Sequence, residues 1–385
     1  MKNLVKILFS IIFKIIILPL RVIPVQKGRI VFSGLTGGNS YEYTGNPKYL
    51  CEYIKENVPE KFKSIWLVHS PARYQEQYDD ILFVRHYSLK SFYYLITTKV
   101  VVTNGSYAPW FPFRTSQKVI NTWHGGGAYK KIESDNPADN KAAKKRVNAA
   151  ASNVSLFVSS CNKATELLFK GAFGYDKEVL EVGMPRNDML INGQVKASAN
   201  KVRDQYQIAP EEKIVIYAPT YRTTIKSIIL DGQQLKQIIS RDGTPWRILL
   251  RTHRYQEAKT HIDIEGTAYT DVSDYPDMQE LLGAADMVIT DYSSLIWDYS
   301  FLERPCFLYV PDIKEYTNKT GFYVDIEQWP FKMATSNEEL IKLIEEYDIN
   351  ENKQLIAKHH QMMGSCETGQ ACKKVTEWIL QEYKK

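Results

Sequence analysis

His124 begins a glycine-rich segment directly after an apolar run that reads as a strand. The segment that follows is Gly125, Gly126, Gly127 and Ala128. Glycines let the backbone approach a ligand closely and expose successive N–H groups to an anion. A neighbouring histidine is suited to taking a proton from an attacking hydroxyl near neutral pH. We therefore predict an anion-binding loop with His124 as a base. The alternative is a tight turn around a buried histidine, whereas a lipase-type oxyanion loop lacks its Gly-x-Ser-x-Gly partner in this sequence.

Basic and hydroxyl side chains follow three further strand-like runs. Arg186, in the segment 182–188, could clamp a phosphate with its planar guanidinium, although Pro-Arg-Asn-Asp is also a good turn. The other residues are Pro219, Thr220 and Arg222 after the run 213–218, and Arg251, Thr252 and His253 at the end of the run 246–251. Such groups would neutralise a diphosphate, which is the main electrostatic task in phosphoryl transfer. For His253, a structural role at the surface is the alternative.

Ser293 and Ser294 lie between the run 287–290 and an apolar helix that carries Asp298 one turn on. At a helix N-terminus, hydroxyls, amides and the helix dipole together attract a phosphate. A simple N-cap would explain one of these residues. It would not explain a serine pair on the ligand side of a strand end.

No common phosphate or metal motif is present in the sequence. There is no Walker loop, and the glycines at 34–38 do not match the dinucleotide fingerprint. His359, His360, Cys366 and Cys372 could be drawn as a zinc site, but their spacing matches no common ligand pair. We therefore expect arginine, lysine, histidine and backbone amides to hold a diphosphate without a metal.

Short apolar runs alternate with helical stretches and predict the elements that position these residues. The runs are 29–32, 64–69, 99–103, 118–123, 156–159, 178–182, 213–218, 246–251, 287–290 and 305–309. This pattern is typical of an α/β protein with doubly wound parallel sheets. A polar stretch at 192–200 is the best candidate linker. Two α/β halves joined there would form a cleft between the carboxyl ends of their strands, where open sheets bind ligands.

The length of 385 residues indicates two domains rather than one core. We predict a membrane-associating helix at 1–25, one α/β domain at 26–194 and a second α/β domain at 195–370. The last helix, at 371–385, would dock back on the first domain.

The N-terminal residues 4–20 are nearly all apolar. At 100° per residue, Lys2, Lys6, Ser10, Lys14 and Arg21 form a narrow basic stripe. Lys14 would lie deep in the bilayer if the segment crossed it, at a cost of several kcal/mol. An in-plane helix on an anionic leaflet is therefore favoured over a spanning helix, and a signal peptide comes last.

Composition narrows the class of partner and the compartment. The net charge of +5 suits an anionic membrane or substrate, and no basic arm indicates nucleic-acid binding. Lys141, Lys144, Lys145 and Arg146 form a basic helix face that is either solvated or in contact with lipid headgroups. Five scattered cysteines indicate a reducing, cytosolic compartment.

Taken in order, these motifs resemble the CDP-glycerol glycerophosphotransferase family of wall teichoic acid synthesis. The matching pieces are Trp123-His124-Gly125, Gly183-x-Pro185-Arg186-Asn187-Asp188, Pro219-Thr220-x-Arg222, Arg251-x-His253, Thr290-Asp291-Tyr292-Ser293-Ser294 with Asp298, and Gly321-Phe322-Tyr323. The resemblance covers about residues 28 to 380. It implies a GT-B fold and peripheral attachment to the cytoplasmic face of a bacterial membrane. The implied reaction is the metal-independent transfer of glycerol phosphate from CDP-glycerol to a lipid-linked saccharide or a growing teichoic acid chain, with release of CMP.

The resemblance also implies roles for individual residues. His124 would be the base for the acceptor hydroxyl, and Arg251 and His253 would stabilise the charge as CMP departs. The positions around the donor would be His124, Gly125, Gly126, Gly127, Ala128, Arg186, Pro219, Thr220, Arg222, Arg251, Thr252, His253, Ser293, Ser294 and Asp298.

The sequence departs from the family pattern at three places, and these leave the polyol and the acceptor open. His124-Gly125-Gly126-Gly127 replaces His-Gly-Thr-Pro, Tyr221 replaces a tryptophan, and residues 365–369 replace an Asp-Gly. The alternatives are a CDP-ribitol transferase, a GT-B sugar transferase that uses a nucleotide-sugar, and an inactive membrane scaffold. The short N-terminal region favours a primase-like enzyme over a polymerase.

Overall fold

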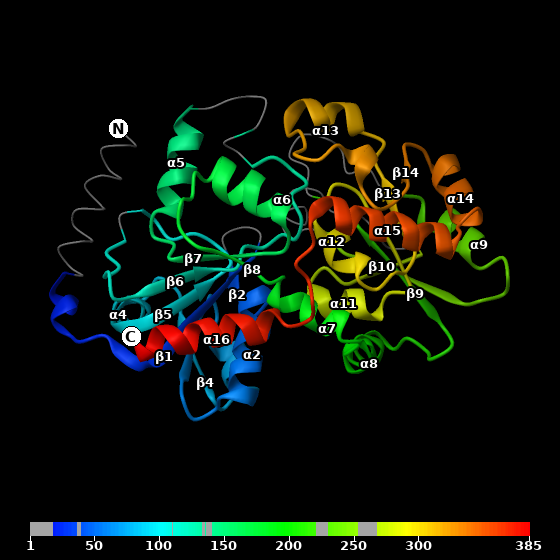
Figure 1. Ribbon diagram of the computed structural model, residues 1–385. Helices are drawn as coiled ribbons and strands as arrows, with labels where there is room; N and C mark the ends of the chain where they lie inside the picture. Colours follow the sequence, from blue (N-terminus) through cyan, green and yellow to red (C-terminus); the bar gives the residue numbers. More distant parts are fainter. Residues whose placement is uncertain are drawn as a thin grey trace, which may run out of the picture.

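The computed structural model describes residues 18–36, 40–109, 111–132, 135, 141–220, 230–252 and 268–385. Within these residues the chain forms two sheets, which lie side by side in Figure 1. We call each sheet with its helices a lobe. This arrangement agrees with the predicted α/β fold of two parallel sheets.

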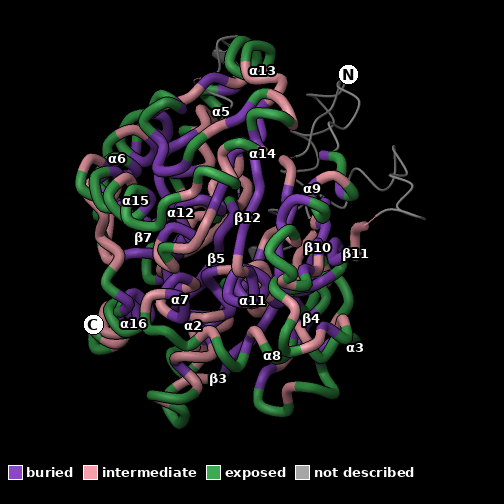
Figure 2. The backbone as a smooth tube through the Cα atoms, turned by 90° about the vertical axis from the view of Figure 1, so that its right-hand side faces the viewer, coloured by how far each residue is buried: buried purple, intermediate pink, exposed green. Residues whose placement is uncertain are grey.

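The first sheet has eight strands in the order β4-β3-β1-β5-β6-β7-β8, with β2 paired to β1. All pairs are parallel except β1 with β2. The strands are β1 (Gln26–Leu35), β2 (Tyr41–Glu42), β3 (Lys63–Val68), β4 (Ile81–Arg85), β5 (Thr98–Thr103), β6 (Lys118–Asn121), β7 (Leu156–Ser159) and β8 (Val179–Glu181). Strand β5 is buried along its whole length, as Figure 2 shows for the centre of the sheet, which is why it reads as continuous Val-rich sequence.

The second sheet has six parallel strands in the order β11-β10-β9-β12-β13-β14. They are β9 (Lys213–Ala218), β10 (Trp246–Leu250), β11 (Tyr269–Asp271), β12 (Met287–Thr290), β13 (Cys306–Tyr309) and β14 (Met333–Ala334). In both sheets the order of strands reverses at the central strand, and the carboxyl ends on either side of that strand form a crevice.

Helices cover both faces of each sheet. Those of the first lobe are η1 (Leu18–Val22), α2 (Gly45–Asn57), α3 (Ala72–Gln75), α4 (Leu89–Thr97), α5 (Lys141–Ala151), α6 (Asn162–Ala164), the π-helix η4 (Thr165–Ala172), η5 (Pro185–Asn187) and α7 (Asp188–Ile191). Those that follow are α8 (Val195–Tyr206), α9 (Gly232–Ile239), α11 (Met278–Ala284), α12 (Leu295–Ser300), α13 (Ile313–Lys319), η6 (Ile326–Gln328), α14 (Asn337–Glu345), α15 (Ile349–Met363) and α16 (Ala371–Lys384).

Local capping fixes where several helices of the second lobe begin. The side chain of Asp277 accepts hydrogen bonds from the amides of Gln279 and Glu280, and Asp231 and Asp348 cap α9 and α15 in the same way. Each cap satisfies amides that have no partner within the helix. Asp277 thereby places the start of α11 against the first lobe.

The chain crosses between the lobes twice. The stretch predicted as a linker, 192–200, is helical from Val195, and α8 packs on α11 of the second lobe. After α15, the chain returns and α16 lies beside α2 on the first sheet (Figure 1). Val375 and Ile379 of α16 are buried in the same hydrophobic cluster as Ile30 and Phe32 of β1.

The predicted membrane helix falls on residues 1–17, which lie outside the described residues, and on η1. None of the helices that the structure describes has both the length and the apolar character needed to span a bilayer.

Candidate active site

A cleft of about 690 Å³ separates the carboxyl ends of the two sheets. Its walls come from strand-end loops of both lobes. The lining residues are Leu35, Thr36, Thr44, Gly45, Asn104, His124, Lys130, Arg186, Ala218, Pro219, Thr220, Arg251, Thr252, Met278, Gln279, Ser293, Ser294, Leu295, Asp298 and Tyr316. The cleft is therefore large enough for a ligand of nucleotide size.

The structure brings most of the predicted site residues to this cleft. The nine that line it are His124, Arg186, Pro219, Thr220, Arg251, Thr252, Ser293, Ser294 and Asp298. Arg222 and His253 lie outside the described residues. Gly125 is partly exposed, whereas Gly126, Gly127 and Ala128 are buried.

The imidazole of His124 is oriented by a backbone carbonyl. Its Nδ1 lies 3.3 Å from the carbonyl oxygen of Asn104, which follows β5. A carbonyl oxygen only accepts hydrogen bonds, so Nδ1 carries the proton and Nε2 keeps its lone pair. The ring surface is open to the cleft. In the neutral form of the ring Nε2 is therefore the basic nitrogen, and no hydrogen bond joins it to the residues that the structure describes.

The surroundings of His124 keep it neutral. Desolvation deep between the lobes lowers its pKa below the usual value, the nearby cations Arg186 and Lys130 lower it further, and the bond to Asn104 acts in the opposite direction. Water in the open cleft counteracts part of the desolvation, but the two cations act in the same direction. At pH 7 the ring can therefore accept a proton.

Two asparagines and a strained residue hold the loop that carries His124. Trp123 has φ 54°, a left-handed conformation that is costly for a bulky side chain. The buried amide of Asn46 donates to the carbonyl oxygens of Thr122 and Trp123, at 3.1 and 3.0 Å. The side chain of Asn121 accepts from the Trp123 amide at 2.8 Å. These bonds fix a backbone turn that would not form by itself.

The glycine run packs closely on the second lobe. A Cβ on Gly126 would lie 2.0 Å from Cδ1 of Trp297, and one on Gly125 would lie 2.9 Å from Oγ of Ser294. The amide of Gly127 is buried and donates to Oγ of Ser160 at 3.0 Å. The glycines thus let the loop of the first lobe pack directly on α12 of the second. The Gly127 amide, one of those predicted to meet an anion, is already occupied by this hydrogen bond.

Arg186 joins the two lobes at the floor of the cleft. Its Nη2 lies 2.6 Å from Oδ2 of Asp298, and Nη1 donates to the carbonyl oxygen of His124 at 2.9 Å. Its backbone amide donates to Oδ1 of Asn46 at 3.1 Å. The guanidinium predicted to clamp a phosphate is thus engaged by a carboxylate, and it also orients the backbone of His124.

Asp298 is buried and incompletely paired. Gln279 donates to Oδ2 at 2.9 Å, while Oδ1 of Asp298 and Nε of Arg186 have no hydrogen-bond partner among the described residues. Desolvation raises the pKa of Asp298, and Arg186 acts against this rise. Buried polar atoms without partners are costly and are found where a ligand or water completes the site.

The loop after β9 is anchored by Asp291. The backbone amide of Thr220 donates to both carboxylate oxygens of Asp291 at 2.9 Å, and its hydroxyl donates to Oδ1 at 2.5 Å. The amide of Tyr292 also donates to Asp291, at 2.6 Å. Asp291 is therefore a positioning group beneath the cleft, and Thr220 uses its hydroxyl to hold the loop.

Arg251 and Thr252 follow β10 on the same wall. Nη1 of Arg251 donates to the carbonyl oxygens of Val272 and Tyr275, at 3.2 and 2.7 Å. The hydroxyl of Thr252 lies 3.0 Å from Oγ of Ser273. These bonds hold a cationic group at the wall of the cleft.

Ser293 and Ser294 stand at the start of α12. Oγ of Ser293 accepts from the Leu295 amide at 3.3 Å. This serine therefore caps the start of the helix, which is the alternative role considered from the sequence. Ser294 makes no side-chain capping bond. Its hydroxyl faces Gly125 across the lobe boundary.

Several residues at the site carried no usable sequence signal. Lys130 and Tyr316 line the cleft. The backbone amide of Lys131 donates to the carbonyl oxygen of Gly321 at 3.1 Å in a short bridge between the lobes. Asn46 and Gln279 act through contacts with residues far away in the sequence. A lone asparagine, lysine or tyrosine in a loop has many possible roles, and only the fold shows which applies.

Glu367 lies where the chain crosses back to the first lobe. It accepts from the Met184 amide at 3.0 Å, from Nδ2 of Asn187 at 3.0 Å and from Nε1 of Trp297 at 2.9 Å. Burial raises its pKa to about 8, and Asp298 adds to the rise. This residue therefore binds groups of both lobes beneath the cleft.

No group of three potential metal ligands occurs among the residues that the structure describes. His359 contacts Tyr129 and the carbonyl of Gln328, at 2.9 and 2.8 Å. His360 contacts Oγ of Ser300 at 2.7 Å. The two histidines that could be drawn as a zinc site thus have structural partners.

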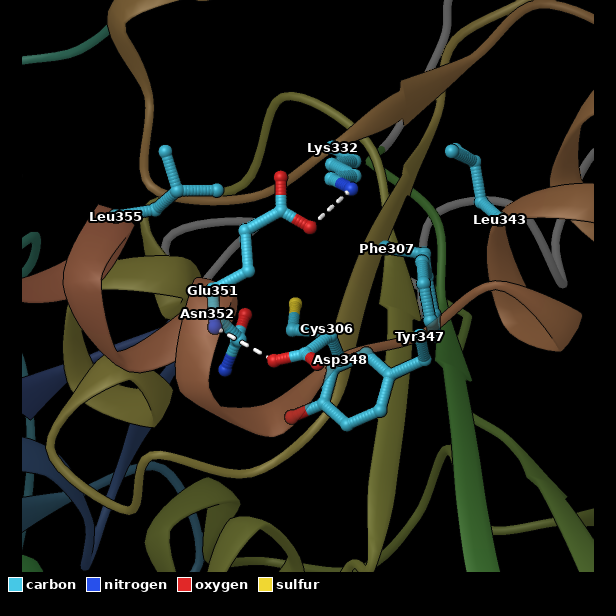
Figure 3. Close-up of a pocket in the computed structure, with 9 residues that line it drawn as sticks. All are labelled: Cys306, Phe307, Lys332, Leu343, Tyr347, Asp348, Glu351, Asn352 and Leu355. Atoms are coloured by element: carbon cyan, nitrogen blue, oxygen red, sulfur yellow. Dashed lines mark hydrogen bonds and ion pairs between the residues drawn. The ribbon is translucent and has the colours of Figure 1, made fainter.

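A second cavity lies between β13 and the helices α14 and α15 (Figure 3). Its volume is about 10 Å³, room for roughly one water molecule. Lys332 and Glu351 in its lining form an ion pair at 2.7 Å. It has no room for a substrate.

Comparison with known proteins adds an independent line of evidence. A family model described as CDP-glycerol:poly(glycerophosphate) glycerophosphotransferase matches residues 16–381. The teichoic acid poly(glycerol phosphate) polymerase of Bacillus spizizenii is 29% identical over 97% of this chain and 96% of its own length. The teichoic acid glycerol-phosphate transferase of Staphylococcus aureus is 28% identical over 92% of this chain and 93% of its own.

Solved structures show the same fold. A structure of the wall teichoic acid polymerase TagF superimposes with a TM-score of 0.80 at 27% identity, covering 94% of this chain and 90% of that chain. A variant of the same polymerase soaked with CDPG has a TM-score of 0.78. A UDP-GlcNAc 2-epimerase from Neisseria meningitidis, at 10% identity and a TM-score of 0.55, shares the fold alone.

Proposed function

Because this chain belongs to the CDP-glycerol:poly(glycerophosphate) glycerophosphotransferase family, we propose that its cleft transfers glycerol phosphate from CDP-glycerol to a lipid-linked acceptor with His124 as base. Members of this family transfer glycerol phosphate in teichoic acid synthesis. The observation that carries the proposal is that His124 lines a cleft of nucleotide size with Nδ1 held by the Asn104 carbonyl, which leaves Nε2 as the nitrogen that can take a proton.

The proposed step is a displacement at phosphorus. The acceptor oxygen attacks the phosphorus that bears glycerol, and its proton passes to Nε2 of His124. The bond from that phosphorus to the bridging oxygen breaks, and the electron pair leaves with CMP. Negative charge grows on the departing phosphate, so cations placed beforehand in the cleft wall lower the barrier.

The first lobe would hold the acceptor and the second lobe the donor, with the domain limits given above. Arg251 and Thr252 would meet the nucleotide side of the donor, together with Arg222 and His253. Lys130 stands at the cleft and adds positive charge from the first lobe. Arg186 and Asp298 contribute by fixing the relative position of the two walls.

The test replaces His124 by glutamine. Loss of the base should lower kcat for CMP release by roughly 100-fold to 10,000-fold. Calorimetric titration with CDP-glycerol should still show donor binding, because Nε2 serves the chemical step. CMP release measured in parallel with CDP-ribitol and a nucleotide-hexose identifies the preferred donor. A His124→Gln protein with normal turnover would falsify the proposed role.

Metal independence is part of the proposal. Its support is the basic wall of the cleft, in which Asp298 is already neutralised by Arg186. After dialysis against a chelator, the rate of CMP release should stay within about twofold of the untreated rate. Activity that vanished on chelation and returned only with magnesium would contradict it.

Attachment to an anionic membrane surface on the cytoplasmic face is proposed from the N-terminal sequence. The apolar residues 4–20 and their basic stripe would lie in the plane of the leaflet. Vesicles containing anionic lipid should sediment the full chain, and a chain lacking residues 1–17 should stay in the supernatant. Binding that is unchanged by this truncation would place the membrane contact elsewhere.

A further inference from the structure

Four aromatic side chains gather at the carboxyl ends of the first-sheet strands. We call Tyr41, His86, Tyr87 and Tyr107 the aromatic cluster. The rings of Tyr41 and His86 stack at 3.5 Å between centroids, and the ring of Tyr87 meets His86 edge-on at 4.1 Å. The hydroxyl of Tyr107 lies 3.1 Å from Oγ of Ser33 at the end of β1. None of these residues takes part in the step proposed above.

Two features of the cluster are unfavourable without a ligand. Both ring nitrogens of His86 are buried and have no hydrogen-bond partner among the described residues. Tyr87 has φ 60°, although it is a bulky residue and its side chain is 70% exposed. Unpaired buried groups and strained backbone are both concentrated where proteins bind ligands.

The cluster is continuous with the cleft. Tyr41 pairs with Leu35, and Leu35 lines the cleft. His124 follows β6, and the strand order β4-β3-β1-β5-β6 places β1 two strands and β4 four strands away. At about 4.8 Å per strand, these positions lie roughly 10 and 19 Å from β6 along the sheet edge. A closer link runs through Asn104, whose Oδ1 accepts from the Leu35 amide at 2.6 Å and whose carbonyl oxygen lies 3.3 Å from Nδ1 of His124. A short saccharide that presents its hydroxyl at His124 would therefore meet the cluster at its Tyr41 side, next to Leu35.

We propose that the aromatic cluster binds the saccharide of the lipid-linked acceptor, an inference that rests on the proposed transfer reaction. The exposed face of the Tyr87 ring packs against the C–H groups of a sugar ring, as aromatic faces do with apolar surfaces. Rotation of the exposed Tyr87 side chain opens the His86 nitrogens to a sugar hydroxyl. The phenol groups of Tyr41 and Tyr107 supply further donors and acceptors.

The test compares His86→Phe and Tyr87→Ala with the wild-type chain. The His86→Phe protein keeps a ring of similar size and loses the two nitrogens, while Tyr87→Ala removes an exposed ring. Leu89→Ala is the matched control, because Leu89 is 79% exposed two residues further on. Initial rates of CMP release are measured with CDP-glycerol and two acceptors: a synthetic short-chain lipid diphosphate carrying a disaccharide, and a short-chain lipid carrying glycerol phosphate without sugar.

Both cluster variants should raise KM for the disaccharide acceptor by about tenfold. The kcat at saturating acceptor, KM for CDP-glycerol and the rates with the sugar-free acceptor should stay within about twofold of wild type. Leu89→Ala should match wild type throughout.

A purely structural His86 predicts the opposite. Phenylalanine removes two unpaired nitrogens, so His86→Phe would be as stable as wild type or more stable, with an unchanged KM. An unchanged disaccharide KM in both variants would overturn the inference and leave the transfer reaction standing. If the wild-type chain released no CMP with any acceptor, the transfer reaction would fall, and the inference with it. Tyr87→Ala keeps the test decisive if His86→Phe fails to fold, since Tyr87 contributes little to the core.

Discussion

The reactivity of His124 depends on what its two nitrogens contact. Nδ1 is committed to the carbonyl of Asn104, so proton transfer is confined to Nε2. Arg186 and Lys130 keep the free ring neutral. A base with a low pKa is weak, and an efficient base has a pKa nearer to the working pH. Binding of the substrate raises the pKa of His124 again, because its diphosphate brings two negative charges close to the ring.

The change in the pKa of His124 on donor binding predicts two different acid limbs in the pH dependence of the reaction. The limb of kcat/KM for CDP-glycerol reports the free enzyme and should lie below pH 6.5, because the cations and desolvation favour the neutral ring. The limb of kcat reports the complex and should lie at higher pH. Initial rates between pH 4.5 and 8.5 measure both. In His124→Gln the residual activity should lack this difference, and coincident limbs in the wild-type chain would contradict the prediction.

Among the contacts between elements, the contact of the glycine loop with α12 leaves no space for an added side chain. Residues 125–127 and α12 come from different lobes, and the backbone at Gly125 and Gly126 lies directly against the side chains of Ser294 and Trp297. Trp297 fills the space above Gly126 and is itself fully buried. The position of Ser294 relative to His124 therefore depends on the absence of a Cβ.

Gly126→Ala should disturb both stability and turnover. Its Cβ would overlap Cδ1 of Trp297 at 2.0 Å, so α12 or the loop must move, at a cost of about 1–3 kcal/mol. The rate of CMP release should fall as well, because the walls of the cleft shift. Gly28→Ala is the matched control, since its nearest contact would be the carbonyl of Lys61 at 4.0 Å. Denaturant unfolding measures the stability of both proteins, and equal midpoints would show that the loop has room to relax.

At the element scale, the sequence predicted the strands in the middle of each sheet but few of the strands at the sheet edges. Each of the ten apolar runs overlaps a strand, because buried parallel strands are continuous apolar segments. The strands β2, β11 and β14 have two or three residues, too few for any pattern. Strand β4 is a run of four apolar residues and Arg85, which periodicity does not distinguish from a helical segment.

The site was predictable to the same extent and for a related reason. Residues that follow strands were singled out, and nine of the thirteen that the structure describes line the cleft, whereas residues 125–128 do not. What they contact was not predictable, since Asn46, Asn104 and Gln279 act across 19 to 140 residues of sequence. The resemblance to a family identified the reaction. The ion pair of Arg186 with Asp298 required the fold.

At the scale of the whole molecule, the lobes are joined by buried charges as well as by two chain crossings. Nζ of Lys48 on α2 lies 2.5 Å from Oδ2 of Asp277 at the start of α11, and Nη2 of Arg186 lies 2.6 Å from Oδ2 of Asp298. Both carboxylate side chains are 2% exposed. A buried ion pair adds little net stability, but removing one partner leaves an uncompensated charge in a place with little water. Such pairs therefore specify one relative position of the lobes.

Removing the cation and then the charge at Asp298 should separate stability from function. Arg186→Met leaves the carboxylate with Gln279 alone, which should cost about 3–5 kcal/mol of unfolding free energy at pH 8. In this variant the pKa of Asp298 is free of Arg186 and rises further, so stability should recover as the pH falls and the carboxyl protonates. Adding Asp298→Asn should restore most of the lost unfolding free energy at pH 8 and abolish that pH dependence. The rate of CMP release should stay low in both proteins, because the cleft walls are no longer fixed. If the double variant were as unstable as Arg186→Met alone, the cost would come from lost packing of the arginine and not from a stranded charge.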